Sequence, residues 1–304
     1  MRKEIRPLLR NLPPKTARAL TQAITNCGKE LGIGAEWVQR WVAFTVVADG
    51  LASWAIDGTP LFEFKGGAAI ELRLRQLQRG GQSDDRAVRP RATKDLDATY
   101  HGALENLEAA VRAALATPRY NFTFRVESET PDAPHMRRFR IRVAYQEERF
   151  GQVVEQPFSN VKLEVSVYEG APLAPEMVAA FSLQPFGIDG PKELPCIPLI
   201  KQIAQKLHAV TEPPAEGCTS DRFRDLLDLV MLSTMVPPSP ELRVVCEETF
   251  HIRARHGWPP EIVTYPHWIE PMEQRAKEMG LDQRSADDIV AHVVRYVRDI
   301  ANAR

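Results

Sequence analysis

One stretch of the chain, LFEFKGGAAIELRLRQLQ at residues 61–78, decides the class of fold. Its first four residues are mostly apolar and β-favouring, which predicts a short strand. Gly66 and Gly67 interrupt that strand, and the residues from Ala68 to Gln78 suit a helix. A strand that turns through two glycines into a helix indicates an α/β region.

The neighbouring segments extend this pattern in both directions. Apolar periodicity predicts helices at 16–30, 35–54 and 105–116, and alternation predicts strands at 92–100, 121–126, 139–145 and 161–168. From residue 198 onward the apolar residues recur at helical spacing. We therefore expect an α/β (α+β) domain with N-terminal helices over residues 1–195. A helical C-terminal domain should follow over residues 196–304.

The composition is that of a soluble globular protein. Hydrophobic residues make up 44% of the 304 residues and charged residues 26%. The net charge of −1 gives no global sign of a nucleic-acid binder, although 39 Lys and Arg residues leave room for a local basic face. The four cysteines lie far apart, which argues against a disulfide framework or a zinc site and favours a reducing compartment.

No segment predicts a membrane protein or a secretory signal. The most apolar run, residues 41–56, is interrupted by Asp49 and is too short to span a bilayer. The first residues are charged and lead into proline-containing sequence, unlike the apolar centre of a signal peptide. We expect a cytoplasmic protein.

The Gly-Gly turn is a candidate phosphate-binding element. Lys65, Gly66 and Gly67 lie between the predicted strand and helix, where glycine lets the backbone approach a ligand and the helix N-terminus offers unpaired N–H groups. Taken alone, such a turn is more often structural than functional.

A second candidate is the pair Asp95 and Asp97. Alternate residues of a strand project from the same face, so both carboxylates point to one side, where hard oxygen ligands suit Mg²⁺. An exposed strand face bearing two acids is an equally good interpretation of these residues alone. Thr93 is the better upstream phosphate contact, because Lys94 faces the other way from Asp95.

Other charged residues become informative in combination. Glu164 lies within a β-branched strand and is either a third metal-facing carboxylate or part of an ordinary solvated face. Lys206 on one helix and Arg224 with Asp225 on the next would usually be exposed charges or ion pairs. Beside a phosphate turn and a metal-binding pair, they become candidates for contacts to a triphosphate, a ribose or a metal.

Together these segments resemble the AbiEii/AbiGii (MenT-like) nucleotidyltransferase toxin family. The residues at 64–73 followed by those at 91–97 are similar to the opening signature of the family, and those at 205–209 and 224–229 are similar to its second signature. A third likeness lies at 249–256. The matches follow family order over most of the chain, and their combination is far more specific than any one of them.

The resemblance implies a polymerase-β-like nucleotidyltransferase core with a helical C-terminal domain that completes the active site. Such an enzyme transfers a nucleoside monophosphate from an NTP to RNA, in studied cases the 3′ end of tRNA, which blocks translation. A co-encoded antitoxin protein neutralises it. The chemistry requires charge neutralisation by Mg²⁺ and in-line positioning.

The resemblance also assigns roles to residues of this chain. Asp95 and Asp97 would hold Mg²⁺ with Glu164 as the third carboxylate, Lys206 would grip the triphosphate, and Asp225 would complete the catalytic set. The expected nucleotide-binding residues are Lys65, Gly66, Gly67, Thr93 and Arg224. The chain departs from the usual pattern in having Ala68 where a serine is common, Glu164 in place of an aspartate, and a long segment between Gly67 and Asp95.

Two alternative functions stay open at this point. The same site would suit transfer of an NMP or a phosphate to a protein hydroxyl, or the chain could be a non-catalytic nucleotide- or partner-binding member. The intact set of Asp95, Asp97, Lys206 and Asp225 argues against the binder, because a carboxylate pair without metal repels phosphate. An RNA acceptor predicts a basic groove beside Asp95, formed by Arg73, Arg75, Arg137, Arg138, Arg253 and Arg255.

Overall fold

The computed structural model describes residues 12–79, 93–130, 136–214, 219–283 and 285–304. Contacts divide the chain into two compact units. The first unit consists of Met1–Gln76, Ala92–Tyr168 and Pro175–Cys196, and the second consists of Leu77–Arg91, Glu169–Ala174 and Ile197–Arg304. Within the long segment between Gly67 and Asp95, residues 80–92 lie outside the described residues.

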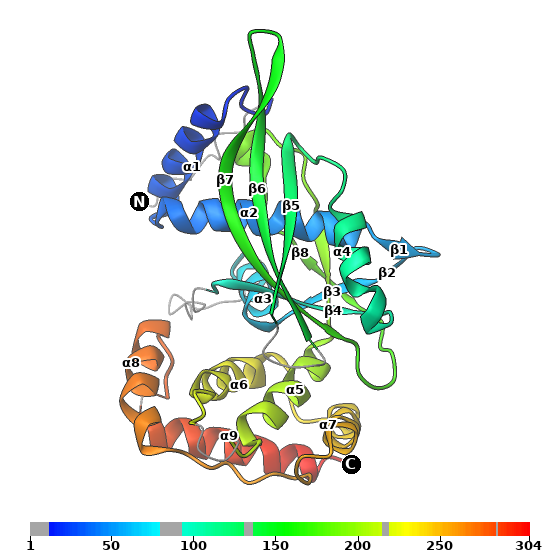
Figure 1. Ribbon diagram of the computed structural model, residues 1–304. Helices are drawn as coiled ribbons and strands as arrows, with labels where there is room; N and C mark the ends of the chain where they lie inside the picture. Colours follow the sequence, from blue (N-terminus) through cyan, green and yellow to red (C-terminus); the bar gives the residue numbers. More distant parts are fainter. Residues whose placement is uncertain (1–11, 80–92, 131–135, 215–218, 284) are drawn as a thin grey trace. The chain divides into compact units, whose positions relative to one another are not determined.

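A mixed seven-stranded sheet forms the centre of the first unit (Figure 1). Its strands, in spatial order, are β5 (Phe122–Glu129), β6 (Met136–Arg149), β7 (Gln152–Val167), β4 (Asp95–Tyr100), β3 (Phe62–Lys65), β9 (Glu193–Cys196) and β8 (Glu176–Ala179). The pairs β4–β7 and β3–β9 are parallel and the others are antiparallel. A small hairpin of β1 (Ala55–Ile56) and β2 (Thr59–Pro60) precedes β3.

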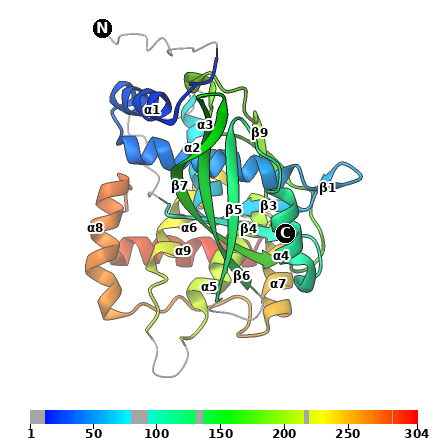
Figure 2. The same cartoon turned by 45° about the horizontal axis from the view of Figure 1, so that its top comes forward.

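One face of this sheet is apolar and packs against a helix. Phe139, Leu163 and Leu96 belong to this buried face, and α2 (Ala35–Ala52) contacts β3, β7 and β9. Figures 1 and 2 show α2 running behind the strands. Residues from nearly the whole circumference of α2 are buried, as expected for a helix within the core of a domain. Burying each large apolar side chain contributes roughly 1.5–3 kcal/mol, so this layer holds the sheet in place.

The remaining helices of the first unit are α1 (Ala17–Leu31), α3 (Gly66–Arg79) and α4 (Leu107–Ala114). The helix α1 begins where the Thr16 hydroxyl accepts a hydrogen bond from the Ala19 N–H, and it ends at Gly32 in the left-handed conformation. The predicted helices and the five predicted strands are present, with ends that differ by several residues.

The hairpin of β6 and β7 is much longer than the sequence predicts. The predicted strands at 139–145 and 161–168 extend to a turn at Phe150 and Gly151, both with positive φ. The residues between are largely polar and exposed, so apolar alternation could not reveal them. The short strands β8 and β9 were not predicted either, because neither has four alternating residues and Pro195 interrupts β9.

The second unit is helical. It contains α5 (Leu199–Thr211), α6 (Phe223–Met235), α7 (Pro240–Arg253), α8 (Ile269–Met279) and α9 (Ala286–Ala301). The predicted apolar stripes form its core, with Leu207 of α5, Leu226 of α6 and Val293 of α9 all fully buried. Among the helices that the structure describes, none is both long enough and apolar enough to cross a bilayer.

Candidate active site

The two aspartates lie on the central strand β4, on the face of the sheet opposite α2. Asp95 and Asp97 alternate with the buried Leu96 and Ala98, so both carboxylates belong to this polar face and both are half-buried. The predicted common orientation of the two carboxylates is therefore present. We call Asp95 and Asp97 the carboxylate pair.

Asp97 lies in a row of charged residues on adjacent strands, which begins with Glu129 on β5. Its register partner on β3 is Lys65, its partner on β7 is Glu164, and the partner of Glu164 on β6 is Arg138. Directly paired residues share a face of the sheet and lie one strand spacing, about 4.8 Å, apart. The row thus places two carboxylates between two cations, in the order Arg138, Glu164, Asp97, Lys65.

The position of the Asp97 side chain requires glycine at residue 66. Gly66 begins α3 with φ of +63°, and a β-carbon at this position would overlap Oδ2 of Asp97. Glycine therefore serves a close approach, as the sequence predicted, but the described group that approaches is a side chain of the same chain. The N-terminus of α3 carries a partial positive charge, which favours the Asp97 carboxylate there.

Lys65 and Thr93 help to shape the surroundings of the carboxylate pair. The Lys65 ammonium donates to Oγ of Ser166 at 2.6 Å, on the strand that carries Glu164. Thr93 is only 6% exposed, and its hydroxyl donates to the carbonyl oxygen of Asp95 at 3.0 Å. The hydroxyl thereby fixes the turn into β4, and its predicted contact with a triphosphate stays a prediction.

Glu164 is held by an arginine. Nε and Nη2 of Arg138 lie 2.8 and 2.6 Å from the same oxygen, Oε1, of Glu164. Glu164 thus lies in an ion pair on a partly exposed face and is the register neighbour of Asp97, and its predicted contact with a metal stays a prediction.

The donors on this face fit a hard divalent cation in kind and position. Among the described residues, no three carboxylate, histidine or cysteine side chains are gathered into a ligand cluster. Mg²⁺ does not need such a cluster, because it usually binds one or two carboxylates and completes its shell with water and substrate phosphates. The carboxylate pair by itself matches that donor set, and a contribution from Glu164 stays a prediction.

A second charged cluster lies within the second unit. Nζ of Lys206 is 2.6 Å from Oδ1 of Asp225 and 2.7 Å from Oδ2 of Asp228. All three residues are buried, and Arg222 approaches the other oxygen of Asp225 at 3.3 Å. Sequence reasoning missed Asp228, although its spacing of three residues from Asp225 on a helix placed both on one face.

Arg224 does not belong to this cluster. Its side chain is exposed, and its guanidinium carbon lies 5.7 Å from the centroid of the Phe223 ring. The predicted nucleotide contact of Arg224 and the predicted triphosphate contact of Lys206 both stay predictions. The two charged clusters belong to different units, and the structure describes each cluster within its own unit.

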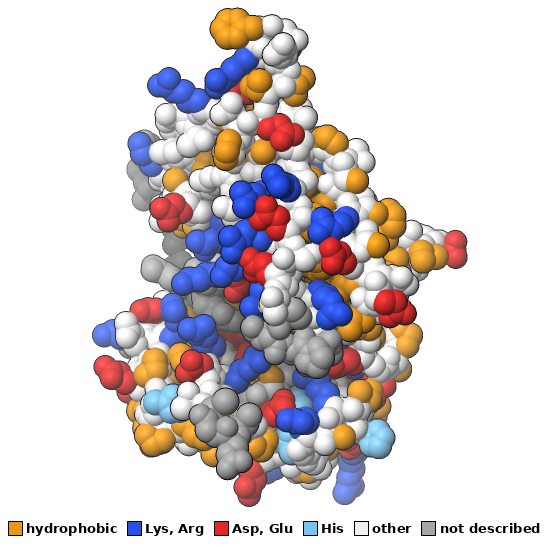
Figure 3. Space-filling model, viewed as in Figure 1, with side chains coloured by type: hydrophobic (Ala, Val, Ile, Leu, Met, Phe, Trp, Pro, Cys, Tyr) orange, Lys and Arg blue, Asp and Glu red, His pale blue; other side chains and the backbone are white. Residues whose placement is uncertain are grey.

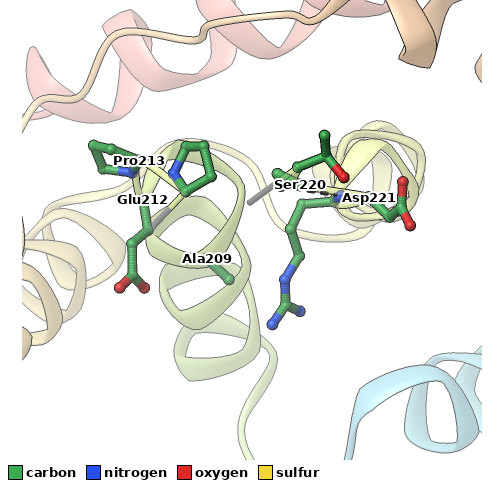
Figure 4. A pocket seen from close by; sticks show the side chains of 8 residues that line it. Ala209, Glu212, Pro213, Ser220 and Asp221 are labelled. Atoms are coloured by element: carbon green, nitrogen blue, oxygen red, sulfur yellow. Dashed lines mark hydrogen bonds between the residues drawn. The ribbon is translucent and has the colours of Figure 1, made fainter. Parts of the chain in front are cut away.

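An open hollow in the second unit lies next to the Lys206 cluster. Glu212 and Pro213, at the end of α5, form one side, and Ser220 and Asp221, before α6, form the other (Figure 4). Arg222 lines the hollow and also contacts Asp225. Two carboxylates among the lining residues would repel a triphosphate, so we assign no nucleotide to this hollow.

The arginines expected to form a basic groove differ in their surroundings, and the groove itself stays a prediction. Arg73 is 6% exposed and bound to Glu176 at 2.8 Å, so it is not a surface group. Arg75 lies over the Trp37 ring. Arg253 and Arg255 form ion pairs with Glu169 and Glu212.

The polar face of the sheet carries the predicted Arg138 together with two arginines that were not predicted, Arg140 and Arg142. Arg138, Arg140 and Arg142 alternate along β6, each close to a glutamate. Figure 3, in the view of Figure 1, shows cationic and anionic side chains mixed on the side of the sheet that faces away from α2. Sequence reasoning could have found this set from the alternation of arginines with Phe139 and Ile141.

Comparison with known proteins decides the family. The family profile described as "Nucleotidyl transferase AbiEii toxin, Type IV TA system" matches residues 51–300, which is most of the chain. The chain belongs to the AbiEii nucleotidyl transferase toxin family. The AbiEii signature thus spans the carboxylate pair in the first unit and the Lys206 cluster in the second, and membership implies transferase activity with an NTP and an antitoxin as partners.

A solved structure supports the same fold. The chain is similar to MenT4, a nucleotidyltransferase toxin from Mycobacterium tuberculosis H37Rv, with a TM-score of 0.54 and 19% sequence identity. The match covers 95% of this chain and 90% of MenT4. It confirms the predicted α/β nucleotidyltransferase fold for this AbiEii protein. No curated protein sequence matches the chain.

Proposed function

We propose that this AbiEii protein transfers a nucleoside monophosphate from an NTP to the 3′ end of an RNA, specifically a tRNA, and thereby blocks translation. The observation that carries the proposal is the carboxylate pair, placed directly beside the glycine turn and beside Glu164. Nucleotidyl transfer depends on positioning and charge neutralisation, and this row of groups suits both tasks.

In the proposed reaction the 3′ hydroxyl oxygen attacks the α-phosphorus of the NTP. The new bond joins the RNA oxygen to phosphorus, the bond to the bridging oxygen breaks, and pyrophosphate leaves with the electron pair while the hydroxyl proton passes to solvent. Mg²⁺, when bound, would neutralise the triphosphate and acidify the attacking hydroxyl. Asp95 and Asp97 are its proposed ligands, with Glu164 as the third.

The other predicted residues receive proposed roles in the same reaction. Lys65 and the N-terminus of α3 at Gly66 and Gly67 offer positive charge and N–H groups to phosphate oxygens. Thr93 keeps lone pairs on its hydroxyl and orients Asp95 through the backbone. We further propose that Lys206, Asp225 and Arg224, from residues 196–304, serve the same reaction, with Lys206 on the triphosphate.

The proposed setting follows from the same assignment. A tRNA acceptor, an NTP and a cognate antitoxin protein are all available in a reducing cytoplasm, where we place this AbiEii protein. The buried free cysteines Cys27, Cys196 and Cys246 agree with that compartment.

The decisive experiment incubates the purified protein with each α-³²P-labelled NTP, Mg²⁺ and total tRNA. Asp95→Asn removes a proposed metal ligand with little change in shape, and Glu129→Gln is the matched control on the same face, since Glu129 pairs with Arg140. We expect label on tRNA with one NTP, a loss of at least about 100-fold with Asp95→Asn, and near wild-type transfer with Glu129→Gln.

Three other outcomes would redirect the proposal. Label on protein would favour transfer to a protein hydroxyl. Label on tRNA that survives Asp95→Asn would remove the carboxylate pair from the mechanism. Binding of NTP without transfer to RNA or protein would favour a non-catalytic member of the family.

A further inference from the structure

Arg138 makes an unusually one-sided contact with Glu164. Both of the guanidinium nitrogens that reach the carboxylate, Nε at 2.8 Å and Nη2 at 2.6 Å, converge on Oε1. The more frequent bidentate arrangement would use both carboxylate oxygens. The present contact fixes the rotamer of Glu164 through one oxygen and leaves Oε2 outside this pair of bonds.

Glu164 is fixed in this way directly beside the carboxylate pair. It is the register partner of Asp97 on the parallel strand β7, and Arg138 is its partner on the antiparallel strand β6. The Arg138 and Glu164 side chains are 24% and 28% exposed, so their contact is partly shielded from water. A glutamate side chain has three rotatable bonds and loses conformational entropy when it is ordered, so a partner that already holds it reduces that loss on metal binding.

We propose that Arg138 is a positioning residue for metal binding: it holds Oε1 of Glu164 so that Oε2 is presented to the divalent cation bound by Asp95 and Asp97. The inference rests on the proposed function, because it takes the carboxylate pair as metal ligands. It adds a role for a residue on β6 that touches neither the cation nor the nucleotide.

The charge of Arg138 and its contact with Glu164 act in opposite directions. A guanidinium near a cation site repels the cation, so removal of the charge alone would strengthen metal binding. Loss of the contact would instead free Glu164 to adopt other rotamers and weaken metal binding. Groups that orient metal ligands typically change metal affinity by about 10- to 100-fold when they are removed.

Arg140 is a matched control for the charge. It lies two residues along the same strand and on the same face, and it pairs with Glu129 at 2.7 Å. Its row leads through Lys162 to Asp95, as the row of Arg138 leads through Glu164 to Asp97. Arg140→Ala therefore removes the same charge from the same face of β6, two residues along the strand, without releasing Glu164.

The test measures Mn²⁺ binding to the full-length protein by electron paramagnetic resonance, without NTP or RNA. We expect the dissociation constant to rise about 10-fold or more in Arg138→Ala and to rise less in Arg138→Lys, which keeps one donor. In Arg140→Ala it should stay unchanged or fall slightly. Circular dichroism and thermal unfolding report whether each variant keeps its fold.

Several outcomes would overturn the inference. Equal or tighter Mn²⁺ binding by a folded Arg138→Ala variant would make Arg138 a competitor of the metal or a bystander, and an equal loss in Arg140→Ala would assign the effect to charge alone. Absence of Mn²⁺ binding by the wild-type protein would also overturn it. Because the readout contains no NTP or RNA, a failure of RNA labelling leaves this result intact, and the two failures are distinguishable.

Discussion

At the scale of single residues, the surroundings of Asp97 show how little space the carboxylate has. The carboxylate occupies the space that a β-carbon on residue 66 would need, and Lys65 and Glu164 lie on either side of Asp97 in the sheet register. The side chain is therefore held by its neighbours rather than by solvent. Small changes in backbone shape at this point should act on the proposed chemistry as well as on stability.

The first prediction concerns Gly66. Gly66→Ala should displace Asp97, because the new β-carbon would overlap Oδ2, and it should lower NMP transfer at least about 10-fold. Gly58→Ala is the control, since Gly58 also has positive φ, at +78°, but no atom within 4 Å of its added β-carbon. It should cost about 1 kcal/mol of stability and leave transfer unchanged. Equal activity of both variants would show that the position of Asp97 is not critical.

The second prediction concerns the tip of the β6–β7 hairpin. Phe150 has φ of +53° and is followed by Gly151 at +78°, a pair of left-handed residues that asparagine and glycine prefer. The Phe150 side chain is fully exposed and loses no packing when it is replaced. Phe150→Asn should raise the free energy of unfolding by about 0.5–1 kcal/mol in urea titrations. Phe150→Ala, which lacks the asparagine side chain, should give little gain, and a destabilised Asn variant would contradict this explanation.

At the scale of elements, α5 carries a buried histidine whose protonation makes stability depend on pH. His208 is 1% exposed, and its ring lies 4.6 Å from that of His256 and 5.0 Å from that of Phe250. Burial, with smaller contributions from Arg253 and His256, lowers the pKa of His208 to about 4. Burial also lowers the pKa of His256.

The third prediction follows from the sign of these shifts. His208 stays neutral in the folded protein, whereas in the unfolded chain it takes up a proton below its ordinary pKa of about 6.5. The contribution of neutral His208 to the free energy of unfolding is therefore complete above pH 6.5 and decreases as the pH falls toward 4. Between pH 7.5 and pH 5 we expect a loss of about 2 kcal/mol from His208. Hydrogen exchange of α5 amides in urea measures this loss. His208→Leu should flatten the profile, and an unchanged slope would assign the titration to other groups.

At the scale of the whole molecule, the charged residues of the family signature lie in two different units. The carboxylate pair lies in the first unit, and the Lys206 cluster lies in the second. Ion pairs lie at both places: Arg138 pairs with Glu164 beside the carboxylate pair, and Lys206 pairs with Asp225 and Asp228 in the second unit. A single reaction that uses both clusters would make them dependent on each other in kinetics.

The fourth prediction tests that dependence. Asp95→Asn and Asp225→Asn should each lower transfer of label to tRNA at least about 100-fold. The double variant should transfer as much label as the less active of the two single variants, because the effects of groups that act as a unit are strongly non-additive. Full activity of a folded Asp225→Asn variant would remove the second unit from the chemistry. Additive losses would instead assign the two residues to separate steps.

The sequence by itself determined the class of the fold and the identity of most candidate residues. Strand-to-helix turns through Gly66 and Gly67, alternation around Asp95 and Asp97, and helical stripes after residue 198 are local patterns, because side-chain direction follows from the period of each element. The family signature added the link between Asp95 and Lys206, which no local pattern contains.

Only the tertiary structure decided which charges are neighbours. Strand register joins Arg138, Glu164, Asp97 and Lys65 although they are widely separated in the chain, and register depends on the pairing of whole strands. The burial of Arg73 could not be read from its charge, because it depends on Glu176 approaching from β8. Local sequence sets which way a side chain points, whereas long-range packing sets what it meets.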